Sequence, residues 1–390
     1  MNNPAESGAP AQPGERVESR NSLDRSLSIL LVTARYVPEI GGTEVHTREL
    51  AERLARRGHR VTVLTTDRSG NLPVREERGG VRILRVRAWP AERDYYLSPG
   101  IVGAMRSSSY DVVHIQGYHT LVAPVAMLSA MRSNIPFVLA FHSGGHSSRV
   151  RRAMRGPQIR ALRPLFGRAH RLVASSASEL QYFKWRLGMP AAKFEMVPVL
   201  ANLPQIADGV QDPFGNTLLV TVGRLEHYKG HQRVIEALPL LRSRVPNLRL
   251  RIVGEGPLES RLYQLAREHH VDDLVTIAAI PPTHRREMAE IMQRAALVIS
   301  LSDFESAGLS IREALSLGRP VLVTDIAGYS DLRGSPLVNA IPLKSPIPVI
   351  ANAIADSLRR TVVAEAADIP TWDECIDQFE RIYRDAIGAR

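Results

Sequence analysis

Short continuous runs of apolar residues recur along the chain, and glycine-containing loops follow several of them. Such runs between turn signals are typical of strands buried on both faces of a parallel sheet. Strands are predicted at residues 28–32, 61–64, 81–86, 111–114, 136–141, 171–174, 218–222, 275–278, 298–299 and 320–324. Segments with helical periodicity are predicted at residues 43–57, 176–187, 285–294, 310–318, 350–359 and 371–387. The alternation predicts an α/β fold with doubly wound, Rossmann-like sheets.

The chain has 390 residues, which is long enough for two domains with separate cores. Residues 204–216 contain proline and glycine in the manner of an interdomain linker. We therefore predict a first domain at residues 26–203 and a second at 217–370. Residues 1–25 lack an apolar signal core and are expected to be disordered. The apolar stripe of the final helix, within residues 371–390, indicates that one face of this helix is buried.

The stretch at residues 298–325 reads as strand, loop, helix, turn and strand. The first amides of its helix have no partner inside the helix, and the helix dipole adds partial positive charge there. These amides suit a diphosphate. They belong to Gly308, Leu309 and Ser310.

Two carboxylates flank this predicted anion site, Glu305 in the loop and Glu313 in the first turn of the helix. Ionised carboxylates only accept hydrogen bonds, so they suit sugar hydroxyls rather than phosphate. Two alternatives are structural. Ser310 and Glu313 fit a capping box, in which Glu313 returns to the Ser310 amide. Glu305 fits an ordinary solvated loop residue.

Other glycine-containing loops also follow predicted strands. Gly41 and Gly42 precede a helix, where backbone without a Cβ can approach an anion closely. A later loop carries two cations, of which arginine can bind two phosphate oxygens and lysine acts as a point charge. The alternative interpretation of these two cations is ordinary solvated surface charge. The residues are Gly223, Arg224 and Lys229 in this loop, and Gly254 and Gly256 in the loop after the next strand.

Two histidines end predicted strands, His114 and His142. The carboxyl end of a strand in an open α/β sheet is where ligands bind, and imidazole has a reference pKa near neutrality. The alternative for each histidine is a structural hydrogen-bond partner.

The net charge of +10 is unevenly distributed, with eight arginines and no acid from Arg149 to Arg171. The segment predicts either a solvated basic face or a surface that attracts anions, such as phospholipid head groups or an acidic acceptor. Its interleaved apolar residues suit peripheral membrane contact. No nucleic-acid module accompanies the charge, so nucleic acid is not expected as a partner.

The cysteine content and the hydropathy of the chain indicate its compartment. A single cysteine, Cys375, suits a reducing cytoplasm, and no apolar run reaches the roughly 18 residues that span a bilayer. We expect a cytoplasmic protein that can lie on the inner membrane face. No metal-ligand cluster or D-x-D pair stands out, so no metal is expected.

Several blocks together resemble one family. The E-x7-E block with Gly318 and Pro320, the GRL-x-x-x-KG loop, the G-x-GP loop and the early GG-x-E loop are similar to those of retaining, family-four glycosyltransferases with the GT-B fold. The resemblance covers residues 28–387. It implies two Rossmann-like domains facing across a cleft, the donor in the second and the acceptor in the first. It also implies that the final helix crosses back to the first domain. The family usually has a bulky aromatic where this chain has Ala307.

The resemblance also implies roles for particular residues. Arg224 and Lys229 would neutralise a leaving diphosphate, together with amides at Gly42, Gly308 and Leu309. Glu313 would hold ribose hydroxyls and Glu305 donor-sugar hydroxyls, with His142 near the anomeric side. Gly41 would shape its turn, and the Gly254 loop would lie near the nucleotide. His114 would be architectural or on the acceptor side.

The function so implied is metal-independent transfer of a sugar from a nucleoside-diphosphate sugar to an acceptor hydroxyl, with retention. The donor is a substrate, and no cofactor is expected. The acceptor fits an anionic or lipid-linked molecule. Two alternatives remain open: a GT-B phosphorylase that uses inorganic phosphate as acceptor, and a non-catalytic protein with a basic binding surface.

Overall fold

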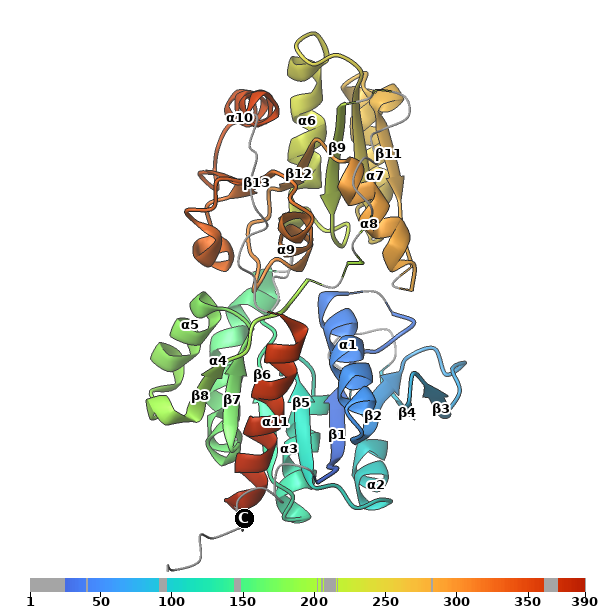
Figure 1. Cartoon of the computed structure of the whole chain (residues 1–390), viewed down its shortest axis with the longest axis vertical. Coiled ribbons are helices and arrows are strands. Elements are labelled where there is room, and N and C mark those ends of the chain that lie inside the picture. The colour runs from blue at the N-terminus through green and yellow to red at the C-terminus, as the bar shows by residue number, and fades with distance from the viewer. Residues whose placement is uncertain are drawn as a thin grey trace, which may run out of the picture.

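A computed structural model describes residues 25–39, 41–90, 97–143, 149–201, 203–204, 206, 215, 217–281, 283–360 and 371–389, with the backbone alone at 149–152. The strands form two separate sheets, stacked along the long axis of the molecule (Figure 1). The predicted tail at residues 1–25 lies outside the described residues except for Arg25, and so does most of the predicted linker. The exact domain boundaries stay predictions.

The first sheet has eight strands in the order β3-β4-β2-β1-β5-β6-β7-β8, and every neighbouring pair is parallel except β3 and β4. Its central strand β1 (Ser28–Thr33) is buried along its whole length, as its continuous apolar run predicts. Ile29 lies opposite Val61 of β2 on one side and Val112 of β5 on the other. The other elements of this domain are α1 (Gly42–Arg56), β2 (Arg60–Asp67), β3 (Arg75–Arg78), β4 (Val81–Arg87), α2 (Gly100–Arg106), β5 (Val112–Gln116), α3 (Val122–Arg132), β6 (Phe137–Ala140), α4 (Arg149–Arg168), β7 (Arg171–Ala174), α5 (Ala177–Leu187), η1 (Ala191–Lys193) and β8 (Phe194–Met196).

The second sheet has six parallel strands in the order β11-β10-β9-β12-β13-β14. Its elements are β9 (Thr217–Val222), η2 (His227–Lys229), α6 (His231–Arg242), β10 (Leu248–Val253), α7 (Glu259–Glu268), η3 (Asp272–Leu274), β11 (Val275–Ala278), α8 (Arg285–Arg294), β12 (Leu297–Ser300), α9 (Leu309–Ser316), β13 (Val321–Thr324), η4 (Ala327–Leu332), β14 (Val338–Ile341) and α10 (Ile347–Arg359).

Helices cover both faces of both sheets, because successive strand residues point to opposite sides. In β1, Ile29 and Leu31 belong to the core beneath α1, whereas Leu30 and Val32 belong to the core beneath α2, α3, α4 and α5. In β9, Leu219 faces α6 and α10, and Val220 faces α8 and α9. The strand order reverses between β1 and β5 in the first sheet and between β9 and β12 in the second. Ligands of open α/β sheets bind outside the carboxyl ends of the strands at such points.

The last helix, α11 (Trp372–Gly388), returns to the first sheet, as the resemblance implies (Figure 1). Thr371 and Glu374 form a capping box at its start. Its buried stripe joins the core beneath α1, and fully burying one large apolar side chain contributes about 1.5–3 kcal/mol. The residues of this stripe are Cys375, Ile376, Phe379, Ile382, Tyr383 and Ala386.

Candidate functional site

Lys229 and Glu305, both expected to bind the donor, contact each other in the second domain. The Lys229 Nζ lies 2.6 Å from Glu305 Oε1, although 76 positions separate them. Lys229 ends the loop after β9, and Glu305 lies in the loop after β12, so the contact sits where the strand order reverses. Ser302 Oγ also donates to Glu305 Oε1 at 2.8 Å. The contact therefore places an ammonium at the carboxyl edge of the sheet.

Lys229 is charged in this environment. Burial opposes the ammonium form, but the adjacent Glu305 carboxylate and Tyr228 more than offset it, so the pKa of Lys229 is raised. The ammonium lies 5.5 Å from the centroid of the Tyr228 ring. A lysine held in this way is a fixed positive charge with limited exposure to water.

The loops after β9 and β10 lie directly against each other. The Gly223 amide donates to the Val253 carbonyl at 3.0 Å, and the Leu225 amide donates to the Glu255 carbonyl at 2.9 Å. Gly254 has a φ of +155°, and a Cβ at this position would overlap the Gly223 carbonyl oxygen. Only glycine allows this approach without displacing backbone. The two predicted nucleotide loops are thus one unit.

The amides predicted to bind phosphate lie at the start of α9. Gly308 is the N-cap, in the left-handed region with a φ of 60°, and the helix begins at Leu309. A Cβ on Gly308 would overlap the ring of Tyr329. The hydroxyl of Tyr329 lies 2.7 Å from Ser300 Oγ. This packing holds the first turn of α9 beside the loop that carries Glu305.

The capping-box alternative for Glu313 is wrong. Because the helix begins at Leu309, Ser310 lies inside it rather than at the N-cap. Glu313 is buried and forms an ion pair with Arg285, at the start of α8. Arg285 had no sequence signal that we recognised. An arginine from a different helix therefore balances the buried Glu313 carboxylate.

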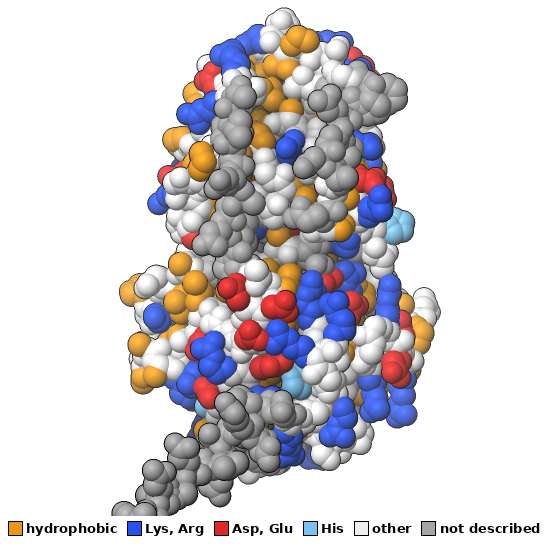
Figure 2. Space-filling view, in the orientation of Figure 1, with side chains coloured by type: hydrophobic (Ala, Val, Ile, Leu, Met, Phe, Trp, Pro, Cys, Tyr) orange, Lys and Arg blue, Asp and Glu red, His pale blue; other side chains and the backbone are white. Residues whose placement is uncertain are grey.

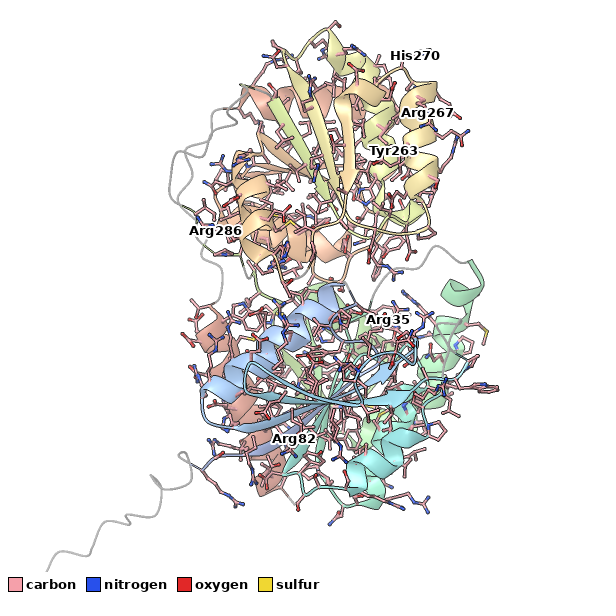
Figure 3. All side chains as sticks on the ribbon, turned by 90° about the vertical axis from the view of Figure 1, so that its right-hand side faces the viewer. Arg35, Arg82, Tyr263, Arg267, His270 and Arg286 are labelled. Carbon is pink, nitrogen blue, oxygen red and sulfur yellow. The ribbon has the colours of Figure 1, made fainter. Side chains whose placement is uncertain are left out.

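The loop after β1 in the first domain faces Arg224 of the second domain. Burial raises the pKa of Glu44, and the positive charges of Arg35 and Arg224 oppose that shift. Arg224 acts on Glu39 in the same way. Figure 3 shows Arg35 on the side of the first domain that faces the second. Gly41 and Gly42, between the two glutamates, therefore lie on the same side as the loop after β9 that carries Arg224, the arginine loop.

Other contacts join the domains beside this region. The guanidinium of Arg155, on α4, lies 5.6 Å from the ring centroid of Phe304, which directly precedes Glu305. Helix α5 also contacts η4 of the second domain. The predicted donor-binding loops therefore border the interface between the domains.

His142 lies at the end of β6, in the left-handed region with a φ of 42°, which is uncommon for a residue with a side chain. Two neighbours hold it there. His119 Nε2 donates to the His142 carbonyl at 2.9 Å, and His142 Nε2 donates to Gln116 Oε1 at 2.5 Å. Burial lowers the pKa of His142, and the negative charge of Glu179 opposes the shift. The ring is thus held neutral with a defined tautomer.

Glu179 fixes the turn that follows His142. It accepts the Ser143 amide at 2.7 Å on one carboxylate oxygen and the Ser175 amide at 2.7 Å on the other. The hydroxyls of Ser143 and Ser175 donate to the same two oxygens. Ser176 and Glu179 have the spacing of a helix start, which could have been recognised in the sequence. The long-range contact with Ser143 could not.

His114 lies in the interior, with no exposed surface. Its Nδ1 lies 2.7 Å from the Tyr383 hydroxyl on α11, and its Nε2 lies 3.2 Å from Gln116 Nε2. Burial lowers the pKa of His114 to about 3. Of the two roles expected for His114, its burial favours the architectural one over contact with an acceptor. The residue connects α11 to Gln116, which holds His142.

His231 supports the arginine loop and was missed in the sequence. Its Nδ1 lies 2.9 Å from Thr221 Oγ1 of β9, and its Nε2 lies 3.3 Å from the Arg224 carbonyl. Burial lowers the pKa of His231 to about 4, with a further contribution from Lys229. A neutral ring therefore connects the end of β9 to the loop backbone.

Neither a metal-ligand cluster nor a membrane-spanning helix occurs among the described residues. Within them, no three His, Cys, Asp or Glu side chains are grouped so as to hold a metal ion. None of the helices in that part of the chain combines the length and apolar character needed to cross a bilayer.

Comparisons with known proteins agree with this geometry. Residues 40–201 match the family model Glycosyltransferase Family 4, and residues 209–339 match Glycosyl transferases group 1. Glycogen synthase of Mycobacterium tuberculosis is 30% identical over 343 residues, which cover 78% of this chain and 80% of that protein. D-inositol 3-phosphate glycosyltransferase of Nocardiopsis dassonvillei is 28% identical over 398 residues, which cover 90% and 91%.

Solved structures share the fold. Sucrose-phosphate synthase from Thermosynechococcus elongatus superposes with a TM-score of 0.67 at 20% identity, over 93% of this chain and 94% of that chain. Anabaena HepE in complex with UDP-glucose superposes with a TM-score of 0.65 at 16% identity, over the same shares. The chain belongs to the group 1, family 4 glycosyltransferases and has the GT-B fold. It is therefore a glycosyltransferase, as its sequence motifs predict.

Proposed function

We propose that this enzyme transfers a sugar from a nucleoside-diphosphate sugar to an acceptor hydroxyl, with retention and without a metal. The observation that carries the proposal is the charged cluster at the reversal of strand order in the second sheet. Lys229 contacts Glu305 there, and Arg224, on the same loop, acts electrostatically on the Gly41–Gly42 loop of the other domain. HepE was solved in complex with UDP and with UDP-glucose, which supports a uridine-diphosphate sugar as the donor.

In this proposal the diphosphate is held from both domains. The ammonium of Lys229, the guanidinium of Arg224 and the first amides of α9 neutralise the charge that develops as it leaves. The amide of Gly42 approaches from the first domain. Glu313 accepts hydrogen bonds from the ribose, and the loops of Gly223, Gly254 and Gly256 face the nucleotide. This division uses cations for phosphate and carboxylates for hydroxyls.

The reaction breaks the bond between the anomeric carbon and the phosphate oxygen. The acceptor oxygen bonds to the same carbon on the same face, and its proton passes to the leaving phosphate oxygen. Glu305 holds donor-sugar hydroxyls, and His142 lies near the anomeric side with its tautomer set by Gln116. Domain closure would exclude water and limit hydrolysis of the donor.

The acceptor is proposed to be an anionic or lipid-linked molecule, and the enzyme to act at the cytoplasmic side of a membrane. The excess of arginines from Arg149 to Arg171 supports an anionic acceptor. So does the similarity to a protein named D-inositol 3-phosphate glycosyltransferase.

The test is Lys229→Ala assayed with a panel of UDP-, GDP-, ADP- and TDP-sugars, chosen by thermal shift. One donor to an anionic transition state is worth roughly a hundredfold or more in turnover, so a loss of that order is expected. Arg224→Ala is a second variant, and because the Arg224 side chain is partly exposed we expect this change to leave the fold intact. Lys344→Ala, an exposed lysine elsewhere, is the matched control. EDTA is expected to leave activity unchanged, and the product is expected to keep the anomeric configuration by NMR. Unchanged turnover and donor affinity in Lys229→Ala would contradict the proposal.

A further inference from the structure

Helices α4 and α5 form a basic face whose α4 arginines already support an anionic acceptor, but no residue of this face takes part in the proposed bond-making step. From Arg149 to Leu187 the sequence has ten Arg and Lys residues and one acid. That acid is Glu179, which is buried and binds the amides and hydroxyls of Ser143 and Ser175. The positive charge of this face is therefore not balanced by its own helices.

Three guanidinium groups line one cavity on this face. The cavity has a volume of about 530 Å³, lies between α4 and the end of α5, and contains no carboxylate in its lining. Arg160 and Arg163 come from α4, and Arg186 comes from α5. None of the three forms an ion pair with an acid in the described part of the chain. Gly156 makes room for the Arg186 guanidinium, since Arg186 Nη2 lies 2.6 Å from where a Cβ at Gly156 would be.

Aromatic side chains stand beside these cations. Trp185 is 75% exposed and Tyr182 is 42% exposed, and their ring centroids lie 6.5 Å apart. The Arg186 guanidinium lies 5.9 Å from the Trp185 ring centroid. Figure 2 shows hydrophobic side chains gathered on the left flank of the lower domain, where Figure 1 places α5. Tryptophan and tyrosine are enriched at the interface between lipid and water, because their rings are amphipathic. Arginines beside them can bind the phosphates of the lipid head groups.

The position of this face is relevant to the acceptor. Arg155 on α4 contacts Phe304, next to Glu305, and α5 contacts η4. The face thus continues to the edge of the predicted donor site. A head group in a bilayer lying against α4 and α5 would be beside the domain interface.

We propose that this α4–α5 face docks the enzyme on an anionic phospholipid bilayer. Arg160, Arg163 and Arg186 bind lipid phosphate in the cavity, and Trp185 inserts into the head-group layer. This goes beyond the proposed transfer reaction, because docking needs neither a donor nor turnover. Each basic residue near an anionic membrane strengthens binding by about fivefold. The loss of the charges of Arg160 and Arg186 is therefore expected to weaken binding by about twenty-five-fold, and charge reversal by more.

The test is co-sedimentation of the full chain with vesicles of phosphatidylcholine alone or with 30% phosphatidylglycerol. Roughly 30% anionic lipid is chosen to give a surface potential that attracts basic segments. The wild type is expected to bind the anionic vesicles, to bind neutral vesicles weakly, and to be released by raised salt. Arg160→Glu with Arg186→Glu is expected to abolish most binding, and Trp185→Ala to weaken it while keeping the salt dependence. Arg163 is left unchanged because its Nε donates to the Leu187 carbonyl at the end of α5.

The matched control is Arg82→Glu with Arg249→Glu, which makes the same charge change at exposed arginines on other elements. Melting temperatures confirm that all variants fold. Equal loss of binding in the control pair would overturn the proposal, because net charge alone would then explain it. Binding that is equal on neutral vesicles would also overturn it. Release from anionic vesicles by equimolar single-stranded DNA would assign the face to polyanions in general and overturn the lipid assignment.

Discussion

Replacement of Glu179 by glutamine tests whether one buried carboxylate holds the turn after His142. Each of its oxygens accepts one backbone amide and one serine hydroxyl. Glutamine keeps the shape but offers an NH2 group where one oxygen was. The serine hydroxyl on that side can rotate to accept, whereas the backbone N–H there loses its partner.

The expected cost follows from these four hydrogen bonds. An unsatisfied buried N–H costs about 1–3 kcal/mol, and the two bonds to the oxygen that remains lose about 1 kcal/mol each when their acceptor becomes neutral. The unfolding free energy should thus fall by about 3–5 kcal/mol. For a domain of this size each kcal/mol lowers the melting temperature by about 2–4 °C, so a decrease of roughly 10 °C is expected.

Thermal unfolding followed by circular dichroism measures this effect. Glu195→Gln is the matched control, since Glu195 on β8 is partly exposed and accepts from Gln378 Nε2 at 3.1 Å. It should change the melting temperature by only a degree or two. Turnover of folded Glu179→Gln should also fall at least tenfold, because the turn carries His142. A melting temperature within 2 °C of the wild type would refute the reasoning.

Two further predictions concern backbone packing and pH. Gly254→Ala should weaken donor binding at least tenfold in calorimetric titration, because its Cβ would force apart the loops after β9 and β10, whereas Gly103→Ala, which has open space, should bind normally. Equal affinity in both would contradict the close approach. Burial lowers the pKa of His114 to about 3 and of His231 to about 4, so below pH 6.5 the unfolded chain binds protons that the folded chain does not. Stability should therefore be full above pH 6.5 and decline as pH falls, by about 2 kcal/mol per histidine at pH 5. His231→Gln should show a shallower decline in melting temperature from pH 7.5 to 5, and an unchanged slope would count against this.

The strands, the helices and the glycine loops could be predicted from the sequence because each depends on local physics. The apolar run of β1 is buried because a central parallel strand has helices on both faces. The helix predicted at residues 43–57 is observed as α1 (Gly42–Arg56), and the one predicted from Ser310 begins one residue earlier. Errors of this size come from helix ends, where the hydrogen-bond pattern is least defined.

The contacts within the site depended on tertiary structure. Gln116 shares a strand and a face with His114, so the alternation of β5 could have indicated it. By contrast, Arg285 beside Glu313 and Glu179 beside Ser143 join segments that no local pattern relates.

The sequence by itself determined the two α/β sheets, the glycine-bounded loops and the list of charged residues on them, because periodicity and backbone freedom act over a few neighbouring residues. Only the tertiary structure decided which charges meet. The 2.6 Å contact between Lys229 and Glu305, and the path from Tyr383 through His114 and Gln116 to His142, arise from strand order and from the return of α11. The physical reason is that such contacts depend on how whole elements pack, and packing is a property of the complete chain.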